Sequence, residues 1–186
     1  MHFREGLLQI KNWSRWVHQL GQQMVETSDE WIRERTGIGE RHVSVGETVV
    51  TLASEAARKA LEQAGKRAEE IDLILVATCS PEQYLPCCAC QVQVDIGAVN
   101  ALAFDVNAAC SGFLFALNTA DAYLRTGLAE NALIIGSEVL SKLVDWTDRS
   151  SCILFGDGAG AVLVEQCGAS GSETIHFLSI HLNIMF

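Results

Sequence analysis

The chain has 186 residues, of which 49% are hydrophobic and 19% charged, and this composition is typical of a globular protein with a large buried core. Its formal net charge of −10 argues against nucleic acid or an anionic membrane as the main partner. No apolar run reaches the roughly 18 residues of a membrane-spanning helix, and segment 1–23 lacks the apolar core of a signal peptide, so we expect a cytoplasmic protein.

Hydrophobic periodicity predicts alternating helices and strands after segment 1–23. The predicted elements are helices over 27–35 and 52–64, a strand over 71–77, a helix over 89–96, a strand over 101–106, a helix over 111–126, and strands over 132–136, 159–165 and 174–181. This alternation predicts an α/β fold with a mainly parallel sheet and helices on both faces. The helix over 111–126 is apolar nearly all round, so we expect it to be buried. The chain has only two prolines and no linker-like tract, which predicts a single unit.

Cys110 stands between a predicted strand and a predicted helix, which is where proteins present a nucleophile. Its neighbours are small, and they leave room for a substrate: Ala108, Ala109, Ser111 and Gly112. The spacing is that of a nucleophile elbow in which alanine replaces the first glycine. The backbone N–H groups and dipole of the helix favour a thiolate, which is a good acyl acceptor. The alternative is a small buried cysteine that serves only packing.

The other cysteines indicate no further chemistry. The chain has seven, an odd number, which favours a reducing compartment over a disulfide framework. Cys87, Cys88 and Cys90 form a cluster, but it lacks the paired C-x-x-C knuckles and the nearby histidine pair of a zinc site. We therefore expect small residues that pack a helix and no metal site.

A glycine-rich stretch, 156–160, invites comparison with loops that bind phosphate. Such loops open a helix, whereas this one precedes a predicted strand. The stretch therefore predicts a turn.

Four segments of the sequence resemble the β-ketoacyl-acyl-carrier-protein synthase III family, whose members have the thiolase fold. They lie within about residues 24–165 and are 27–38 (TSDEWIRERTGI), 71–78 (IDLILVAT), 105–113 (DVNAACSGF) and 145–161 (DWTDRSSCILFGDGAGA). The resemblance implies a thiolase-like α/β fold with a mainly parallel sheet and a buried central helix.

The resemblance also implies an activity. In this family a cysteine accepts an acyl group from acyl-CoA, and the acyl-enzyme then condenses with malonyl-acyl carrier protein at the start of fatty acid biosynthesis. Cys110 matches that cysteine. The resemblance implies an acyltransferase that has acyl-CoA as a substrate, binds no permanent cofactor and forms a homodimer.

Five residues match family positions that contact CoA. Trp31 matches a tryptophan that stacks on the adenine ring, and Arg149 matches an arginine on the other side of that base. Arg35 and Thr36 match positions near the nucleotide and its phosphates, and Thr27 lies at the rim of the same site. The alternatives are a core role for Trp31 and a helix-capping role for Thr27 or Ser28.

The sequence departs from the family pattern in two respects. Family members consist of two similar halves, and their catalytic histidine and asparagine lie in the second half, whereas none of the five histidines here stands at a matching position. Segment 1–23 also diverges from the family's opening strand. We therefore expect residues 24–186 to form a truncated N-terminal half domain that is weakly active or inactive. The alternative is a non-catalytic fragment that binds CoA or pairs with a related subunit.

Overall fold

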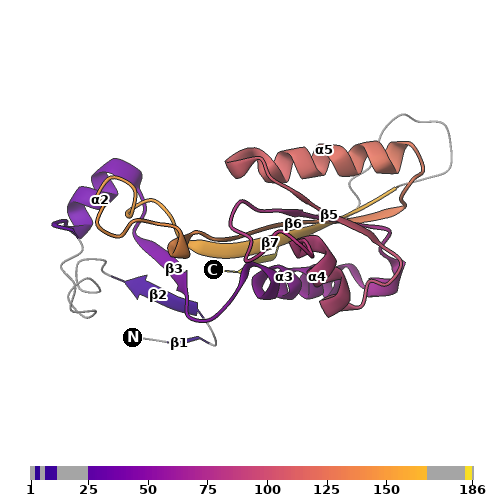
Figure 1. Ribbon diagram of the computed structural model, residues 1–186, viewed down its shortest axis with the longest axis horizontal. Helices are drawn as coiled ribbons and strands as arrows, with labels where there is room; N and C mark the ends of the chain where they lie inside the picture. The colour runs from indigo at the N-terminus through magenta and orange to yellow at the C-terminus, as the bar shows by residue number, and fades with distance from the viewer. Residues whose placement is uncertain (1–2, 5–6, 12–24, 167–182, 186) are drawn as a thin grey trace. The chain divides into compact units, whose positions relative to one another are not determined.

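The computed structural model describes residues 3–4, 7–11, 25–166 and 183–185 (Figure 1). The strand predicted over 174–181 lies outside these residues. The residues of the chain group into two compact units. The first comprises residues 1–47, 139–158 and 186, and the second comprises 48–138 and 159–185. The chain passes from the first unit to the second, back to the first and again to the second. Because no single linker joins the two units, no linker-like composition marks the division.

A five-stranded sheet is the centre of the second unit, with the strand order β5-β4-β6-β7-β8. The strands are β4 (Leu73–Ala77), β5 (Leu102–Val106), β6 (Asn131–Val139), β7 (Asp157–Glu165) and β8 (Asn183–Met185). β4 pairs in parallel with β5 and with β6, so that Leu73 lies opposite both Leu102 and Ala132, whereas β8 is antiparallel to β7. The predicted α/β architecture is thereby confirmed.

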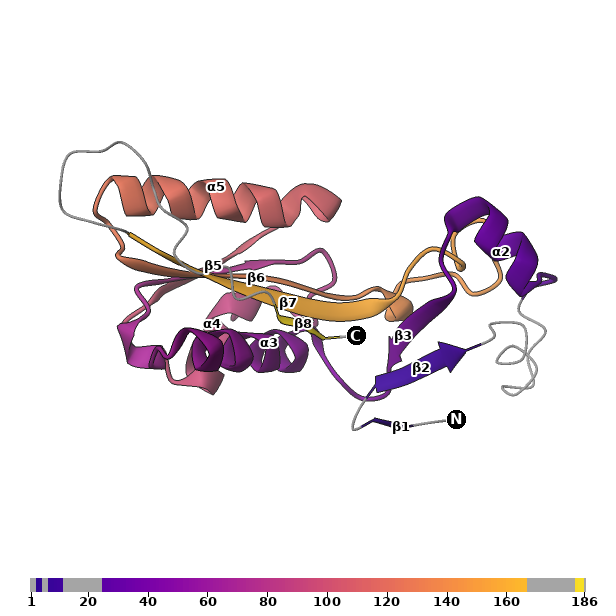
Figure 2. The ribbon, with the colours of Figure 1, turned by 180° about the vertical axis from the view of Figure 1, so that it is seen from behind.

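Helices cover both faces of this sheet. α3 (Val49–Ala64) and α4 (Cys88–Ile96) lie on one face and α5 (Gly112–Arg125) on the other (Figures 1 and 2). α3 begins earlier than predicted because Thr48 and Thr51 form a capping box. α3 and α4 end, as predicted, at the left-handed glycines Gly65 and Gly97.

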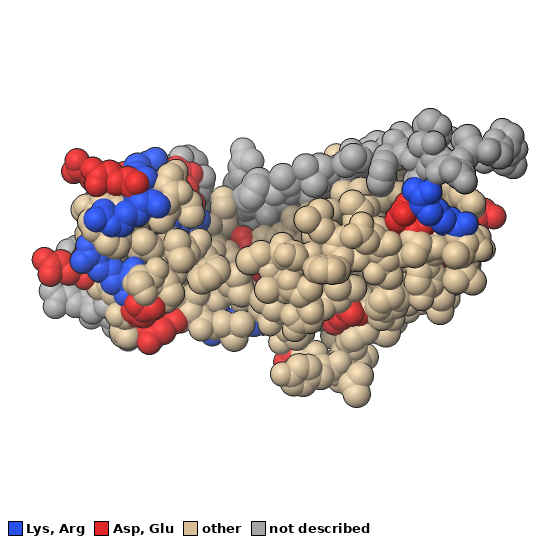
Figure 3. Space-filling view, turned by 90° about the horizontal axis from the view of Figure 1, so that it is seen from above, with Lys and Arg blue, Asp and Glu red and all other residues tan. Residues whose placement is uncertain are grey.

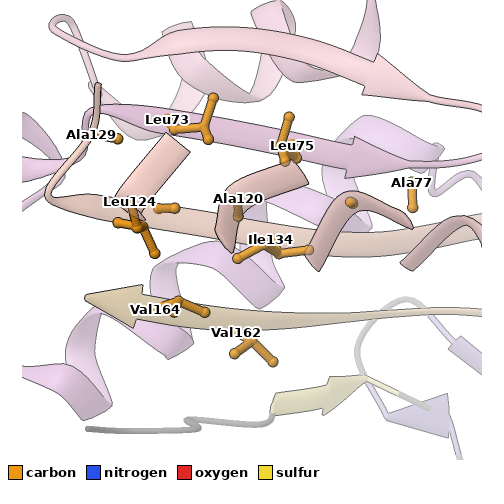
Figure 4. Packing of buried hydrophobic residues seen from close by; sticks show 11 residues of the cluster. Leu73, Leu75, Ala77, Ala120, Leu124, Ala129, Ile134, Val162 and Val164 are labelled. Carbon is orange, nitrogen blue, oxygen red and sulfur yellow. The ribbon is translucent and has the colours of Figure 1, made fainter. Parts of the chain in front are cut away.

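The second unit has buried residues on both faces of its sheet, and one core cluster lies between the sheet and α5. All five residues of β4 are buried, as expected for a parallel strand covered on both faces. Leu75 on β4, Ile134 on β6 and Val164 on β7 pack in one cluster with Ala120 and Leu124 of α5 (Figure 4). The small residues of α5 allow the helix to lie close to the sheet.

α5 is buried along one stripe, and its opposite face is exposed. The residues it buries are Gly112, Ala116, Ala120 and Leu124. Leu114 and Phe115 are 62% and 56% exposed. Figure 3 looks onto this side of the molecule, and the surface over α5 carries few charged side chains. The prediction of a helix buried all round therefore holds for one face only, because nothing in the described part of the chain covers the other.

The first unit combines an antiparallel sheet with a short helix. β1 (Phe3–Arg4), β2 (Leu7–Lys11) and β3 (Glu40–Ser44) pair in that order, so the divergent N-terminal segment supplies two strands. α2 (Asp29–Thr36) begins at Ser28, whose hydroxyl accepts the Trp31 N–H at 3.1 Å. The small core of the first unit is made of Ile32, Val43, Cys152 and Ile153.

Asp157, in the glycine-rich stretch, ties the first unit together. Its buried carboxylate accepts the Ser44 N–H at 2.7 Å, and the N–H and hydroxyl of Ser141 at 2.8 and 2.6 Å. A Cβ on Gly156 would lie 3.1 Å from the carbonyl oxygen of His42, so this position needs glycine for close approach. Residues 157–160 already belong to β7, and only Gly156 precedes this strand, so the prediction of a turn over 156–160 is wrong.

Among the described residues, no helix is both long and apolar enough to cross a membrane. The same residues contain no group of three or more histidine, cysteine, aspartate or glutamate side chains arranged to hold a metal ion.

Candidate functional site

Cys110 lies in a short 3₁₀ turn, Ala109–Ser111, between the end of β5 and the start of α5. Its thiol is exposed. The position at a strand-to-helix turn is therefore confirmed, and the alternative of a buried packing cysteine is excluded.

The backbone around Cys110 is tightly constrained. Ala109 adopts a φ of 47°, which for a residue with a Cβ costs about 1–2 kcal/mol. A Cβ on Gly112 would lie 3.3 Å from the Ala77 Cβ and 3.7 Å from the Val106 carbonyl oxygen. Gly112 thus lets α5 start directly against the carboxyl ends of β4 and β5. The turn is wedged between the sheet and the helix, so the thiol is held in a defined place.

The first turn of α5 offers a favourable environment for negative charge. Its N-cap residue, Ser111, makes no side-chain hydrogen bond to the helix. The first N–H groups of a helix lack partners within the helix and carry a partial positive charge. At α5 the Ser111 and Gly112 N–H groups donate to the Ala108 and Ala109 carbonyl oxygens of the preceding 3₁₀ turn. The partial positive charge of the helix start would still favour a thiolate or an oxyanion near Cys110.

Glu138, at the end of β6, organises the loop beside Cys110. Its carboxylate accepts the Cys79 N–H at 2.7 Å, the Thr78 hydroxyl at 3.2 Å and the Ser80 hydroxyl. Burial raises the pKa of the Cys79 thiol, and the hydrogen bond to Glu138 and the nearby charges of Glu138 and Cys110 raise it further. Cys79 is therefore a neutral thiol next to the candidate nucleophile.

Glu138 was not identified from the sequence. The sequence does hold a signal for it. Glu138 is an acidic residue in a strand of mostly apolar and small residues, and it lies at the end of that strand, on the same sheet edge as the turn that carries Cys110.

The second group of predicted site residues lies in the first unit. The guanidinium carbons of Arg35 and Arg149 lie 4.2 and 3.8 Å from the centroid of the Trp31 ring, within the range of cation–π interactions. Trp31 is half-buried and also packs against the small core of this unit. The structure thus brings three predicted residues together, and Trp31 has both the packing role and an accessible ring.

Two aspartates shape the loop that carries Arg149. Asp148 accepts the Ser150 N–H at 2.9 Å and the hydroxyls of Ser150 and Ser151. Asp145 accepts the N–H and hydroxyl of Thr147 at 2.9 and 2.6 Å. These hydrogen bonds lower the pKa values of both carboxyl groups. The loop is therefore held by ionised carboxylates at neutral pH.

The two predicted threonines differ in whether their hydroxyl groups already have hydrogen-bond partners. The Thr36 hydroxyl donates to the Ile32 carbonyl at 2.8 Å and accepts the Ile38 N–H at 3.0 Å, so it serves the end of α2. The Thr27 hydroxyl oxygen is buried and has no hydrogen-bond partner among the described residues. The N-cap of α2 is Ser28, so Thr27 has no capping role.

Of the five histidines, the structure describes only His42, which lies on β3 in the first unit, whereas Cys110 belongs to the second. Burial lowers the pKa of His42, against a smaller opposing effect of Glu40, so its imidazole is mostly neutral at pH 7. Within the described residues, the unit that contains Cys110 has no histidine to act as its general base.

Comparison with solved structures defines the class of fold. The 3-oxoacyl-[acyl-carrier-protein] synthase III of Aquifex aeolicus VF5 superposes with a TM-score of 0.80 at 45% identity, over 88% of this chain and 53% of that structure. The fold is the thiolase-like α/β fold, present here as a single half.

Comparison of sequences gives the family. A family profile for 3-oxoacyl-[acyl-carrier-protein (ACP)] synthase III matches residues 104–183. The β-ketoacyl-[acyl-carrier-protein] synthase III of Clostridium perfringens strain SM101 is 57% identical over 151 residues, which cover 79% of this chain and 47% of that protein. The corresponding protein of Anaplasma marginale is 60% identical over 159 residues, covering 82% and 49%. The chain belongs to the β-ketoacyl-acyl-carrier-protein synthase III family, and it spans about half the length of the curated relatives it matches.

Proposed function

We propose that this chain belongs to an acyltransferase that condenses acyl-CoA with malonyl-acyl carrier protein through an acyl-cysteine at Cys110, the step that initiates fatty acid biosynthesis. In this proposal residues 24–186 correspond to the N-terminal half of the thiolase-like enzyme, which works in the cytoplasm as a homodimer without a permanent cofactor. The observation that supports it best is the exposed Cys110 thiol on a tight turn at the start of α5.

The acyl transfer follows from the chemistry of that turn. The Cys110 thiolate attacks the carbonyl carbon of the acyl-CoA thioester, a new carbon–sulfur bond forms, and the bond to the CoA sulfur then breaks. The CoA thiolate leaves and takes up a proton. In this proposal the Cys110 N–H donates to the transient oxyanion.

The CoA nucleotide is proposed to bind at Trp31 in the first unit, with its adenine between the indole and the Arg149 guanidinium. Without a ligand, Arg149 lies directly on the indole at 3.8 Å, so the base has to displace it before stacking. Arg35 supplies positive charge for the phosphates. Thr27 and Thr36 belong to the same sequence motif as Trp31. The buried Thr27 hydroxyl has no partner among the described residues and would have to turn outward to reach the nucleotide, whereas the Thr36 hydroxyl holds the end of α2.

The acyl transfer is tested with the 186-residue chain and acetyl-CoA, with the intact mass and a peptide map as readouts. We expect one acetyl group on Cys110 and none on the buried Cys152. Cys110→Ser should remove this modification, whereas Cys87→Ser should retain it. Acetylation that is spread over several cysteines, or that survives in Cys110→Ser, would contradict the proposal. Condensation is measured separately, by adding malonyl-acyl carrier protein to the acetylated chain.

A second candidate function is binding of CoA or pairing with a related subunit, without catalysis. The apolar exposed face of α5, with Leu114 and Phe115, favours the pairing role, since large exposed apolar surfaces mark interaction sites. Trp31 and Arg149 could bind CoA without Cys110, because they belong to a different unit.

Titration of tryptophan fluorescence with CoA tests the nucleotide site independently of acylation. We expect Arg149→Ala to weaken binding about tenfold, equivalent to about 1.4 kcal/mol. The matched control is Arg125→Ala, an exposed arginine on α5 that should leave binding unchanged. CoA binding without acetylation of Cys110 would favour the second function, whereas an unchanged fluorescence at all CoA concentrations would exclude the nucleotide site.

A further inference from the structure

Two cysteines lie face to face at the start of α4. Cys87 is the N-cap residue of the helix and Cys90 lies in its first turn, and their sulfur atoms are 3.4 Å apart. Residues 87–90 read C-C-A-C, so this pair has the C-x-x-C spacing. We propose that Cys87 and Cys90 form a redox-active dithiol, which low-molecular-weight disulfides convert reversibly into an intramolecular disulfide.

The geometry of the pair supports this proposal. Residues three apart in a helical turn lie on the same face. A disulfide has a sulfur–sulfur distance of about 2.05 Å, so the two sulfurs need to approach by only about 1.4 Å. Cys88, between them, is fully buried, and burial raises its pKa to about 12. The chain therefore presents two thiols to each other and keeps the third one apart and protonated.

The pair is also accessible to a small reagent. Cys87 and Cys90 are half-buried, and the loop that leads into Cys87 is highly exposed, with Tyr84 at 89% and Leu85 at 85%. A small disulfide can approach from this side. Cys152, by contrast, is enclosed in the core of the first unit.

The surroundings set the speed of the reaction. The Asp105 carboxylate already accepts the N–H groups of Cys88 and Ala89 at 2.9 and 2.7 Å. The hydrogen bond with Cys87 raises the pKa of Cys90, and burial and the charge of Asp105 raise it further. The Cys90 thiol also lies 3.6 Å from the Ala103 carbonyl oxygen, to which it donates. These interactions favour the protonated form of the Cys90 thiol, unlike the low-pKa cysteines of catalytic oxidoreductases.

The chemical step is thiol–disulfide exchange. One of the two cysteines loses its proton to solvent and attacks a sulfur of glutathione disulfide, which releases one glutathione thiolate and leaves a mixed disulfide. The second cysteine then attacks the protein sulfur of the mixed disulfide and releases the second glutathione. The two protein thiols are oxidised to one disulfide, and one glutathione disulfide is reduced to two thiols.

The test exposes the full 186-residue chain to defined mixtures of reduced and oxidised glutathione. After acid quenching, free thiols are alkylated and the cross-link is located by peptide mapping. We expect a loss of two hydrogens, a link between Cys87 and Cys90, and no glutathione retained at either position. Cys87→Ser and Cys90→Ser should each retain one glutathione at the remaining cysteine. A cross-link to Cys88, or stable mixed disulfides in the wild-type chain, would overturn the proposal.

A second measurement tests whether the folded structure, and not only the C-x-x-C spacing, determines how easily the pair is oxidised. The glutathione ratio at which half of the pair is oxidised should differ at least about tenfold between the folded chain and the chain in urea, equivalent to about 30 mV. An identical ratio in both conditions would also overturn the proposal. Cys88→Ala and Cys110→Ser are the controls and should oxidise like the wild type. Because Cys110→Ser removes the thiol of the proposed acyl transfer, oxidation of the pair in this variant is independent of that proposal.

Discussion

α4 and α5 belong to the same unit and each begins beside a cysteine, yet their first turns differ. The first amides of α4 are occupied by the Asp105 carboxylate, which binds the N–H groups of Cys88 and Ala89. At α5, the N-cap residue Ser111 makes no such bond, and Cys110 is exposed. A helix start that holds a protein carboxylate is used for stability, whereas one without a side-chain cap can stabilise the charge of a reaction.

The largest effect is expected when the cap of α4 is removed. Asp105→Ala leaves two buried N–H groups without their acceptor, and we expect it to reduce the free energy of unfolding by about 2 kcal/mol. Urea denaturation measures this change. The matched control is Asp121→Ala on α5, which removes an ion pair with Arg125 and should cost about 0.5 kcal/mol. Equal losses in the two variants would mean that Asp105 is not a cap.

A smaller effect is expected when the start of α5 is pushed off the sheet. In Gly112→Ala the new Cβ would lie 3.3 Å from the Ala77 Cβ, so the contact between α5 and the end of β4 has to widen by a few tenths of an ångström. We expect a loss of about 1 kcal/mol in stability and slower acetylation of Cys110. Gly136→Ala is the control, since its Cβ would meet only the Phe113 ring at 3.6 Å, an ordinary contact. Unchanged acetylation in Gly112→Ala would show that the turn is not held as tightly as the structure indicates.

The smallest effect, at pH values only slightly above 9, concerns the buried thiol of α4. The pKa of Cys88 is raised from 9.0 to about 12 in the folded chain, chiefly by burial. Between these values the unfolded chain releases a proton that the folded chain keeps, so stability falls as the pH rises above about 9. Cys88→Ala should reduce this slope in urea denaturation curves recorded from pH 7 upward. A slope that is the same in the variant would assign the alkaline sensitivity to other groups.

Local patterns predicted most of the second unit well. The apolar run of β4 predicted a doubly covered strand, and Gly65 and Gly97 predicted the ends of α3 and α4. Cys110 was identified from its place between a predicted strand and a predicted helix, from its small neighbours and from the family resemblance. Glu138 was missed because its partners at 78–80 are some 60 residues away in the sequence and meet it only when the parallel strands align.

The sequence by itself determined the alternation of helices and strands, the glycine helix ends and the turn that carries Cys110, because each depends on residues that are close along the chain. Only the tertiary structure decided the division into two units, the stacking of Arg149 on Trp31 and the single buried stripe of α5. The Cys87–Cys90 pair lies between these cases, since its spacing is local while the 3.4 Å approach of its sulfurs depends on how α4 is packed. Contacts between distant segments depend on packing, which a pattern of neighbouring residues does not encode.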